Sequence, residues 1–296
     1  MPISASDLVG WLDTLVQGVL LGGLYALFAL GLSLAFGVMR LVNIAHGDLI
    51  VLSAFGAVAL VLGTGASPYL AFAVVVPAMG ALGYVLQRVL LNRTLGGDIL
   101  PPLLVTFGLS IIIQNLLLEV FSADSRSLRA EGFETASIPL GGGIAVGWLP
   151  LSVFLAAAAV TAGLELLFGR TRLGRAFRAS SDDRITAQLM GIGHRHVFAL
   201  ATAVSFAIVA VAGIFLAFRT TVAPSDGPGY LLYAFEAVII GGMGSFWGTF
   251  GGGVILGVAQ AVGFRFDPGW GILVGHLACL AVLLTRPEGL FPRTRD

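Results

Sequence analysis

The feature that most constrains this chain is the length of its uncharged apolar stretches. No charged residue occurs in Leu49–Leu86 or in Val197–Phe218. The first stretch is far longer than the roughly 20 residues that span the hydrocarbon core of a bilayer. Only 11% of the residues are charged, against a usual share of about 25%, which leaves too little charge to cover a soluble domain. The sequence therefore predicts an all-α, polytopic membrane protein without a β-sheet.

Apolar segments of membrane-spanning character recur along the whole chain. They lie near Leu12–Gly37, Leu49–Leu62, Tyr69–Leu91, Pro102–Phe121, Leu149–Phe168, Val197–Phe218, a glycine-interrupted pair within Tyr233–Phe264, and Trp270–Leu284. We expect eight or nine transmembrane helices, some of them broken or re-entrant, in a single transmembrane domain over residues 1–296. The first segment lacks the preceding positive charge of a signal peptide, so we interpret it as a retained helix.

Arginine supplies all sixteen basic residues, and its distribution predicts the orientation of the chain. Loops rich in arginine stay in the cytoplasm, which predicts a cytoplasmic loop at about 170–196 and a large external loop at about 122–147. The C-terminus is also expected in the cytoplasm. The arginines of the cytoplasmic loop and of the C-terminus are Arg170, Arg172, Arg175, Arg178, Arg184, Arg195, Arg286, Arg293 and Arg295.

The absence of lysine excludes two kinds of chemistry. A Walker A loop cannot be formed without its lysine, so the chain is not a conventional P-loop ATPase, and Schiff-base catalysis needs the same residue. The net charge of zero gives no indication of nucleic-acid binding. The single cysteine, Cys279, excludes an internal disulfide. We expect no cofactor bound by this chain itself.

Two interruptions of the apolar pattern, one in each half of the chain, are candidates for a solute path. The first runs from Arg40 to Asp48 and the second from Gly241 to Gly248. Broken helices at membrane depth occur only where the freed backbone groups line a cavity or are buried in protein. Paired breaks are typical of a solute site between structural repeats. An ordinary loop at the first break and tight helix packing at the second would explain the same pattern.

Glu236 lies just ahead of the second interruption and joins the candidate path, because a buried ionisable group in a membrane segment is a functional candidate by default. The alternative is an interfacial glutamate paired with Arg219 at the external end. The residues predicted to approach the solute path are Asn43, His46, Gly47, Asp48, Glu236, Gly241, Gly242, Gly244 and Ser245.

An enzyme of the membrane interior is a competing hypothesis. Ser245 and His276 could form a serine hydrolase dyad, which needs the hydroxyl within about 3 Å of the imidazole. The usual motif has glycine two residues before the serine, where this chain has Met243. We therefore expect no catalytic residue. His46 and Asp48 could bind a metal, but two ligands do not make a structural site, so no metal site is expected.

The arginine-rich loop contains a predicted short helix. Ser180 followed three residues later by Asp183 fits a capping pattern, and Asp182 and Asp183 would then occupy the first turn, where the helix dipole favours negative charge. Gly191 is placed as the C-terminal cap. The predicted helix therefore covers about 182–192.

One face of this predicted helix is apolar, since Ile185, Gln188, Leu189 and Ile192 repeat at helical spacing. An isolated helix of about ten residues is marginal in water. We expect the helix to pack either against the membrane surface, as arginine-flanked amphipathic helices do, or against a soluble protein.

Motifs along nearly the whole chain, from about Gly18 to Phe291, resemble the branched-chain amino acid ABC permeases of the LivH type, in the order and separation of that family. The external loop at about 122–147 follows no pattern of the family. The segments that carry the resemblance are Gly23–Leu27, Phe36–Met39, Asn43–Asp48, Thr106–Ser110, Gln114–Asn115, Thr171–Ala179, Ala187–Ile192, Gly241–Ser245 and Arg286–Leu290.

The resemblance implies a transport subunit of a bacterial inner membrane that contacts lipid and no nucleic acid. It implies a second permease, identical or related, two separate ATPase subunits that bind ATP and Mg, and a periplasmic or extracellular solute-binding protein. The short helix is then the coupling helix, which enters a groove on the ATPase. The residues implied in coupling are Gly174, Arg175, Arg178, Asp182, Ile185, Ala187, Leu189, Gly191 and Ile192.

The solute class follows from the resemblance alone. Branched-chain or other small amino acids are expected first, with urea, short amides and aromatic acids as alternatives. An ion-coupled secondary transporter would also use broken helices, but it would have no need of a capped, arginine-flanked docking loop.

Overall fold

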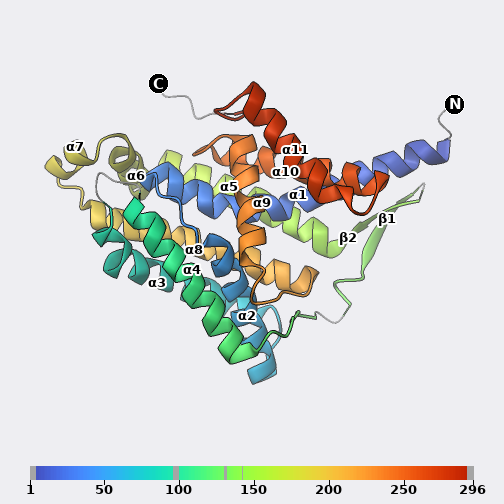
Figure 1. Ribbon diagram of the computed structural model, residues 1–296, viewed down its shortest axis with the longest axis horizontal. Helices are drawn as coiled ribbons and strands as arrows, with labels where there is room; N and C mark the ends of the chain where they lie inside the picture. The colour runs from blue at the N-terminus through green and yellow to red at the C-terminus, as the bar shows by residue number, and fades with distance from the viewer. Residues whose placement is uncertain (1–4, 96–99, 130–131, 142, 292–296) are drawn as a thin grey trace.

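A computed structural model describes residues 5–95, 100–129, 132–141 and 143–291 (Figure 1). Most of these residues are helical. The elements in chain order are α1 (Ala5–Met39), α2 (His46–Thr64), α3 (Leu70–Val89), a 3₁₀ turn η1 (Leu91–Arg93), α4 (Leu100–Phe121), β1 (Ser137–Gly141), β2 (Ile144–Gly147), α5 (Trp148–Arg170), α6 (Arg172–Asp182), α7 (Arg184–Leu189), α8 (His194–Arg219), α9 (Gly227–Gly241), α10 (Phe246–Phe266) and α11 (Trp270–Thr285).

The polytopic helical class predicted from the sequence is confirmed. Within the described residues, seven helices are long and apolar enough to cross a membrane: α1, α2, α3, α4, α5, α8 and α10. The apolar helices α9 and α11 are shorter. The expected total of eight or nine crossings is close to this set, and the membrane-crossing role of α9 and α11 stays a prediction.

The expectation of a chain without β-structure was wrong in one place. In the predicted external loop, β1 and β2 form an antiparallel hairpin in which Ser137 pairs with Gly147 and Ile138 with Val146. Gly141 and Gly143 have φ values of 88° and 90°, which glycine adopts at little cost and which tight hairpin turns require. Outside the bilayer a two-stranded ribbon is tolerated, because water satisfies its edges. Residues 130, 131 and 142 of the predicted loop lie outside the described residues, as do Arg293 and Arg295.

Glycine allows α1 and α10 to pack at very short range. A Cβ added at Gly18 would lie 2.8 Å from Cα of Val258, and one added at Gly253 would lie 2.6 Å from the backbone nitrogen of Ala26. Both distances are too short for any larger side chain. Small residues are the usual means by which membrane helices approach closely, since lipid offers no hydrophobic drive for their association.

The most buried helices are α1, α2 and α8, whose inner faces form a core of leucine, alanine and phenylalanine. By contrast, α3, α4, α5 and α11 turn large apolar side chains outward; Leu104, for example, is 69% exposed. Apolar surface of this extent is expected where the surroundings are hydrocarbon or another membrane helix.

Candidate functional site

The first interruption is a folded turn between α1 and α2. The Oδ1 atom of Asn43 accepts a hydrogen bond from the amide of Ala45 (3.0 Å), and the carbonyl of Asn43 accepts one from the amide of His46 (3.2 Å). Asparagine commonly organises turns through such local bonds. Asn43 is only 4% exposed. The break is shorter than predicted, because His46 already begins α2.

His46 fixes the start of α2 against the middle of α1. Its Nε2 atom lies 2.7 Å from the carbonyl oxygen of Phe28, and a carbonyl can only accept, so His46 is the donor. Phe28 precedes the end of α1 by about three turns. The chain therefore doubles back after Met39, and α2 starts well inside the helical body rather than at its end.

Asp48 and Gly47 lie in the first turn of α2 and contact two other helices. Asp48 is 1% exposed and accepts a hydrogen bond from Nε2 of Gln114 on α4 (2.9 Å). A Cβ at Gly47 would collide with the backbone of Gly227 and lie 2.8 Å from the nitrogen of Leu231. The start of α9 is therefore packed directly on the start of α2, which joins the two halves of the chain.

The second interruption separates α9 from α10, as predicted. Gly242 and Gly244 have φ values of 99° and 82°, and the Ser245 hydroxyl accepts a hydrogen bond from the amide of Gly248 (3.1 Å) as the N-cap of α10. A Cβ at Gly37 would lie 3.3 Å from Cα of Gly244. The second break thus touches the last turn of α1, just ahead of the first break. Gly241 ends α9 and packs against Gly248.

Residues after α11 close over the second break, a contact that the sequence did not reveal. The amides of Leu290 and Phe291 donate hydrogen bonds to the carbonyls of Ile240 (2.9 Å) and Gly241 (3.1 Å). Gly289, with φ 86°, lies against Gly242 so closely that a Cβ would overlap its backbone. Gly289, which follows the end of α11, was the available signal in the sequence. Its contact with Gly242 could not be predicted from the sequence.

Glu236 pairs with His276 of α11, and the alternative pairing with Arg219 was wrong. Oε1 of Glu236 contacts Nδ1 of His276. The carboxylate lies near the middle of α9 and turns toward α11, whereas Arg219 ends α8. Glu236 is 5% exposed, and its Oε2 atom is buried without a hydrogen bond to any described residue.

A second polar pair lies near Glu236. The hydroxyl of Tyr25 donates to Oε1 of Gln260 (2.5 Å), while Nε2 of Gln260 is buried without a partner in the described part of the chain. Tyr25, Glu236, Gln260 and His276 therefore form a polar cluster from α1, α9, α10 and α11, in which His276 reaches the surface of an otherwise apolar helical body.

The structure gives no support to an enzymatic or metal site at the predicted positions. The hydroxyl of Ser245 is engaged at the start of α10, and His276 is engaged with Glu236. Among the described residues, no group of three or more His, Cys, Asp or Glu side chains could hold a metal ion.

The arginine-rich loop contains two short helices where one was predicted. α6 is capped by Thr171, whose hydroxyl accepts from the amide of Gly174 (2.9 Å). Asp183, and not Ser180, is the N-cap of α7: its carboxylate accepts from the amides of Ile185 (2.9 Å) and Thr186 (3.1 Å). Asp182 is consequently the last residue of α6. Ser180 is buried against the body of the protein and cannot serve as the cap.

The hydrogen bonds at Asp183 also affect its acidity. The hydroxyl and amide of Thr186 and the amide of Ile185 hold the pKa of the Asp183 carboxyl below its usual value. The carboxylate form is favoured because each of these donors binds the charged state.

The predicted cap at Gly191 is confirmed. Gly191 has φ 82° and donates to the carbonyl of Gln188, while the amide of Ile192 donates to the carbonyl of Ala187, both at 2.9 Å. This pair of bonds is the Schellman arrangement that satisfies the last carbonyls of a helix. α7 is therefore capped at both ends although it has only six residues.

Three large apolar side chains of this loop project into solvent. Ile185, Leu189 and Met190 are 72%, 82% and 78% exposed, whereas Ala187 is 5% exposed and faces the protein. Met190 was not among the predicted coupling residues, because it lies outside the helical spacing of Ile185 and Leu189. Ile185 and Leu189 therefore lie on an exposed apolar face, whereas Ile192, which was predicted to share that face, is half-buried and packs against the core. What covers the exposed face remains a prediction.

α6 anchors this outer face to the membrane helices. Phe177 is fully buried and packs against Phe168 at the end of α5, with ring centroids 5.4 Å apart and the rings tilted by 41°. Arg178 donates to the carbonyl of Phe168, and Gly174 packs on the same turn of α5 without room for a Cβ. Arg175 is exposed. A displacement of α7 would therefore reach α5 through α6.

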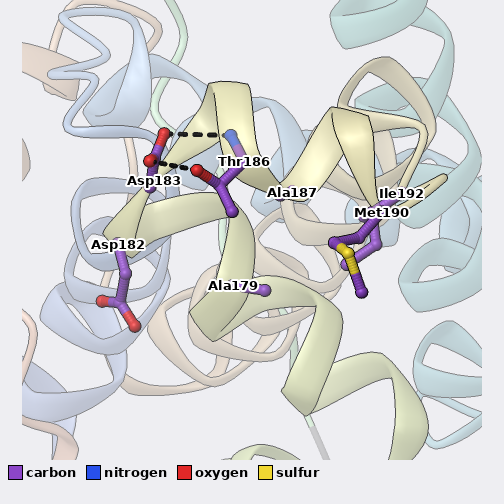
Figure 2. Close-up of a pocket in the computed structure, with 7 residues that line it drawn as sticks. All are labelled: Ala179, Asp182, Asp183, Thr186, Ala187, Met190 and Ile192. Carbon is purple, nitrogen blue, oxygen red and sulfur yellow. Dashed lines mark hydrogen bonds between the residues drawn. The ribbon is translucent and has the colours of Figure 1, made fainter.

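A pocket opens between α6 and α7 (Figure 2). Figure 2 shows the Asp183 carboxylate turned toward Thr186, while Asp182 lies apart from it. The residues that line the pocket are Ala179, Asp182, Asp183, Thr186, Ala187, Met190 and Ile192.

Comparisons with known proteins agree over nearly the full length. Residues 14–278 match the family model described as a branched-chain amino acid transport system permease component. The chain is 32% identical to the high-affinity branched-chain amino acid transport system permease protein BraD of Pseudomonas aeruginosa, over 97% of both chains. It is 30% identical to the permease protein LivH of Salmonella typhimurium over 96% of both. The permease protein LivM of the same organism is 28% identical over 92% of this chain and 68% of its own length.

Proposed function

The chain belongs to the family of permease components of branched-chain amino acid transport systems, and from this membership we propose the details of its function. It forms the membrane-spanning path of an ATP-driven importer for branched-chain or other small amino acids. The names of the relatives favour this solute class. Urea, short amides and aromatic acids are the alternative solutes.

The exposed apolar face of α7 is the observation that carries this proposal. Ile185 and Leu189 project from a short helix that is capped at both ends, so the face keeps its shape before any partner binds. Large apolar side chains gathered on a polar loop mark an interaction site. The chain has no lysine and therefore no Walker A loop. We infer that ATP and Mg are bound by two partner ATPase subunits, one of which docks on this face.

The distribution of arginine supports the proposed orientation in a bacterial inner membrane. α6 and α7 lie at one end of the molecule and the β-hairpin lies at the other (Figure 1). The hairpin is held to α1, since Nε2 of Gln17 donates to the carbonyl of Ala145 (2.9 Å). The arginine-rich end faces the cytoplasm. The C-terminal segment lies on the same side, because Leu290 binds Ile240 close to the second break.

The proposed solute path follows the two breaks and the polar cluster of Glu236. Asn43, His46, Asp48 and Glu236 are each at most 5% exposed and so lie away from lipid. A second permease, identical or related, provides the opposite wall, and a periplasmic solute-binding protein delivers the solute. Residues 1–296 act as one transmembrane domain in this arrangement.

Reconstitution into proteoliposomes tests the proposal. The chain is incorporated with its second permease and ATPase subunits, and uptake of radiolabelled leucine is measured with the solute-binding protein and ATP. We expect uptake that requires all components. Uptake by the chain alone under an ion gradient would instead establish a secondary transporter. Competition by urea, short amides or benzoate at matched concentration identifies the alternative solutes.

Accessibility to thiol reagents tests the solute path. Single cysteines are placed at Asn43, His46, Glu236 and Ser245 in a Cys279→Ser background, because Cys279 is the chain's single cysteine. We expect labelling from the aqueous side in at least one nucleotide state. Protection of all four positions in every state would remove these residues from the path.

A further inference from the structure

We propose that the pocket between α6 and α7 receives one cationic side chain, an arginine or a lysine, from the ATPase subunit. The inference rests on the proposed function, since it names the chemistry of the partner at the same face. In this arrangement α7 enters a groove of the ATPase while the ATPase in turn inserts a side chain beneath α7. The contact is therefore reciprocal.

The pocket combines an apolar floor with a single free carboxylate. Ala179, Ala187 and Ile192 supply methyl and methylene surface. Asp183 is engaged with α7, because its two oxygens accept from Ile185 and Thr186. The other carboxylate of the lining, Asp182, makes no hydrogen bond or ion pair with any described residue. Long cationic side chains match such a site, since their stems lie on apolar surface while the charged head reaches a polar rim.

The arginines near the pocket do not neutralise Asp182. Arg178 is turned inward and donates to the carbonyl of Phe168. Arg184 lies over the ring of Phe198, with its guanidinium carbon 5.1 Å from the ring centroid. Both side chains are held by their own chain, so the free carboxylate remains available to a partner. Charge-assisted bonds of this kind, particularly bidentate ones from arginine, are stronger than neutral hydrogen bonds.

Charge also decides between a protein side chain and a lipid headgroup as the occupant. The charged residues in the lining of the pocket, Asp182 and Asp183, are both acidic, so the pocket itself disfavours anionic phosphate groups, which are the usual ligands of arginine-rich membrane-surface helices. An aromatic side chain would fill the apolar floor and leave the carboxylate unpaired. A cation with an apolar stem satisfies both parts of the pocket.

Charge variants at Asp182 test the inference. Binding of the purified ATPase to the detergent-solubilised permease complex is measured at low salt for the wild type, Asp182→Asn and Asp182→Arg. We expect several-fold weaker binding for Asp182→Asn and at least tenfold weaker binding for Asp182→Arg. The affinity for the ATPase that these variants lose should be the part of the wild-type affinity that falls as the salt concentration rises. Replacing each groove arginine or lysine of the ATPase with glutamate in turn should identify one change that restores binding to Asp182→Arg.

A second variant probes the pocket without changing charge. Ala179→Leu fills the floor, and we expect it to weaken ATPase binding while the melting temperature of the permease stays unchanged. If Ala179→Leu lowers the melting temperature, the result for Asp182→Arg decides, because that change alters only an exposed side chain. Equal affinity of the ATPase for the wild type and Asp182→Arg would overturn the inference.

ATPase binding by Leu189→Asp and by Asp182→Arg distinguishes a failure of the proposed function from a failure of this inference. If Leu189→Asp also leaves ATPase binding unchanged, α7 is not the docking element, and the proposed coupling role is wrong. If Leu189→Asp abolishes binding while Asp182→Arg does not, α7 docks and only the cationic occupant is refuted. If neither Leu189→Asp nor Asp182→Arg changes ATPase binding, the face is assigned to lipid.

Discussion

The backbone amide of Leu290 lies 2.9 Å from the carbonyl oxygen of Ile240 and donates a hydrogen bond to it. Ile240 belongs to the last turn of α9, whose carbonyls have no partner within the helix. Phe291 supplies the next donor, to Gly241. The chain therefore stabilises its second break with residues that follow α11.

A first prediction concerns this contact. Gly289→Ala places a Cβ against the backbone of Gly242 and forces a residue with φ 86° to carry a side chain. The left-handed conformation alone costs about 1 kcal/mol for a non-glycine residue, and displacing the two hydrogen bonds adds roughly 1 kcal/mol each. We expect a lower melting temperature in detergent and reduced transport. Glu288→Ala, one residue earlier and exposed, should change neither, and an unaltered melting temperature for Gly289→Ala would contradict the proposed role of the contact.

A second prediction concerns the exposed face of α7. Leu189→Asp places a charge where the ATPase is proposed to cover an apolar side chain. Burying an unpaired charge costs several kcal/mol, which corresponds to a loss of affinity of a hundredfold or more. Because Leu189 is 82% exposed, the permease should still fold and reach normal membrane levels. Pull-down of the ATPase at matched expression measures the effect.

Ser125→Asp is the matched control for this change, because it adds the same charge at an exposed position of the loop that is proposed to be external. It should leave ATPase recovery unchanged. Full recovery and full uptake with Leu189→Asp would show that α7 rests on lipid and that coupling occurs elsewhere.

A third prediction concerns the pH dependence of α7. The folded-state pKa of Asp183 is depressed by the donors at Thr186 and Ile185. A depressed pKa stabilises the fold at pH values above the unfolded pKa of about 3.9. This contribution is lost as the pH falls through the lower, folded pKa. We expect the amides of Ile185 and Thr186 to lose protection from hydrogen exchange, corrected for the intrinsic rate, only below about pH 4.

The matched variant for the cap is Asp183→Asn, which keeps an acceptor oxygen but cannot titrate. Its exchange at these amides should be independent of pH in the same range. Identical pH profiles for the wild type and Asp183→Asn would show that the carboxylate does not control the start of α7.

A fourth prediction concerns the pair of Glu236, which is buried, and His276, whose side chain is 37% exposed. Removing one partner of a fully buried pair typically costs about 3–5 kcal/mol, because the other is left uncompensated, and the exposure of His276 makes the expected cost here smaller. We therefore expect His276→Leu to destabilise the protein more than the double variant Glu236→Gln/His276→Leu. A double-mutant cycle on melting temperature or on denaturant midpoint measures the coupling. Additive effects of the two single variants would show that the contact is energetically irrelevant.

The sequence was sufficient for features that depend on local pattern. Long apolar runs predicted the membrane helices, and the glycines at 241, 242 and 244 predicted the interruption between α9 and α10. Gly191 was identified as a helix end because few other residues tolerate its backbone conformation. These predictions needed no knowledge of which helices are neighbours.

Features that depend on tertiary contacts were not predictable. The partner of Glu236 is 40 residues away on α11, and only the packing of two helices reveals it. The start of α7 was misplaced because serine and aspartate are both favoured N-cap residues, and only the continuation of α6 through Ser180 to Asp182 shows that Asp183 is the cap. The donors of Leu290 and Phe291 are ordinary backbone amides, which carry no sequence signal.

The close contact between α1 and α10 has a consequence for the synthesis of the protein. Gly18 and Gly22 of the first helix face Val254 and Gly257 of the tenth, so their partner surface leaves the ribosome only after most of the chain is complete. At about 5–20 residues per second, translation of the intervening segment takes on the order of ten seconds or more. During that interval the glycine face of α1 must be held by lipid or by the insertion machinery. Quality control of a truncated chain can therefore act on this uncovered face.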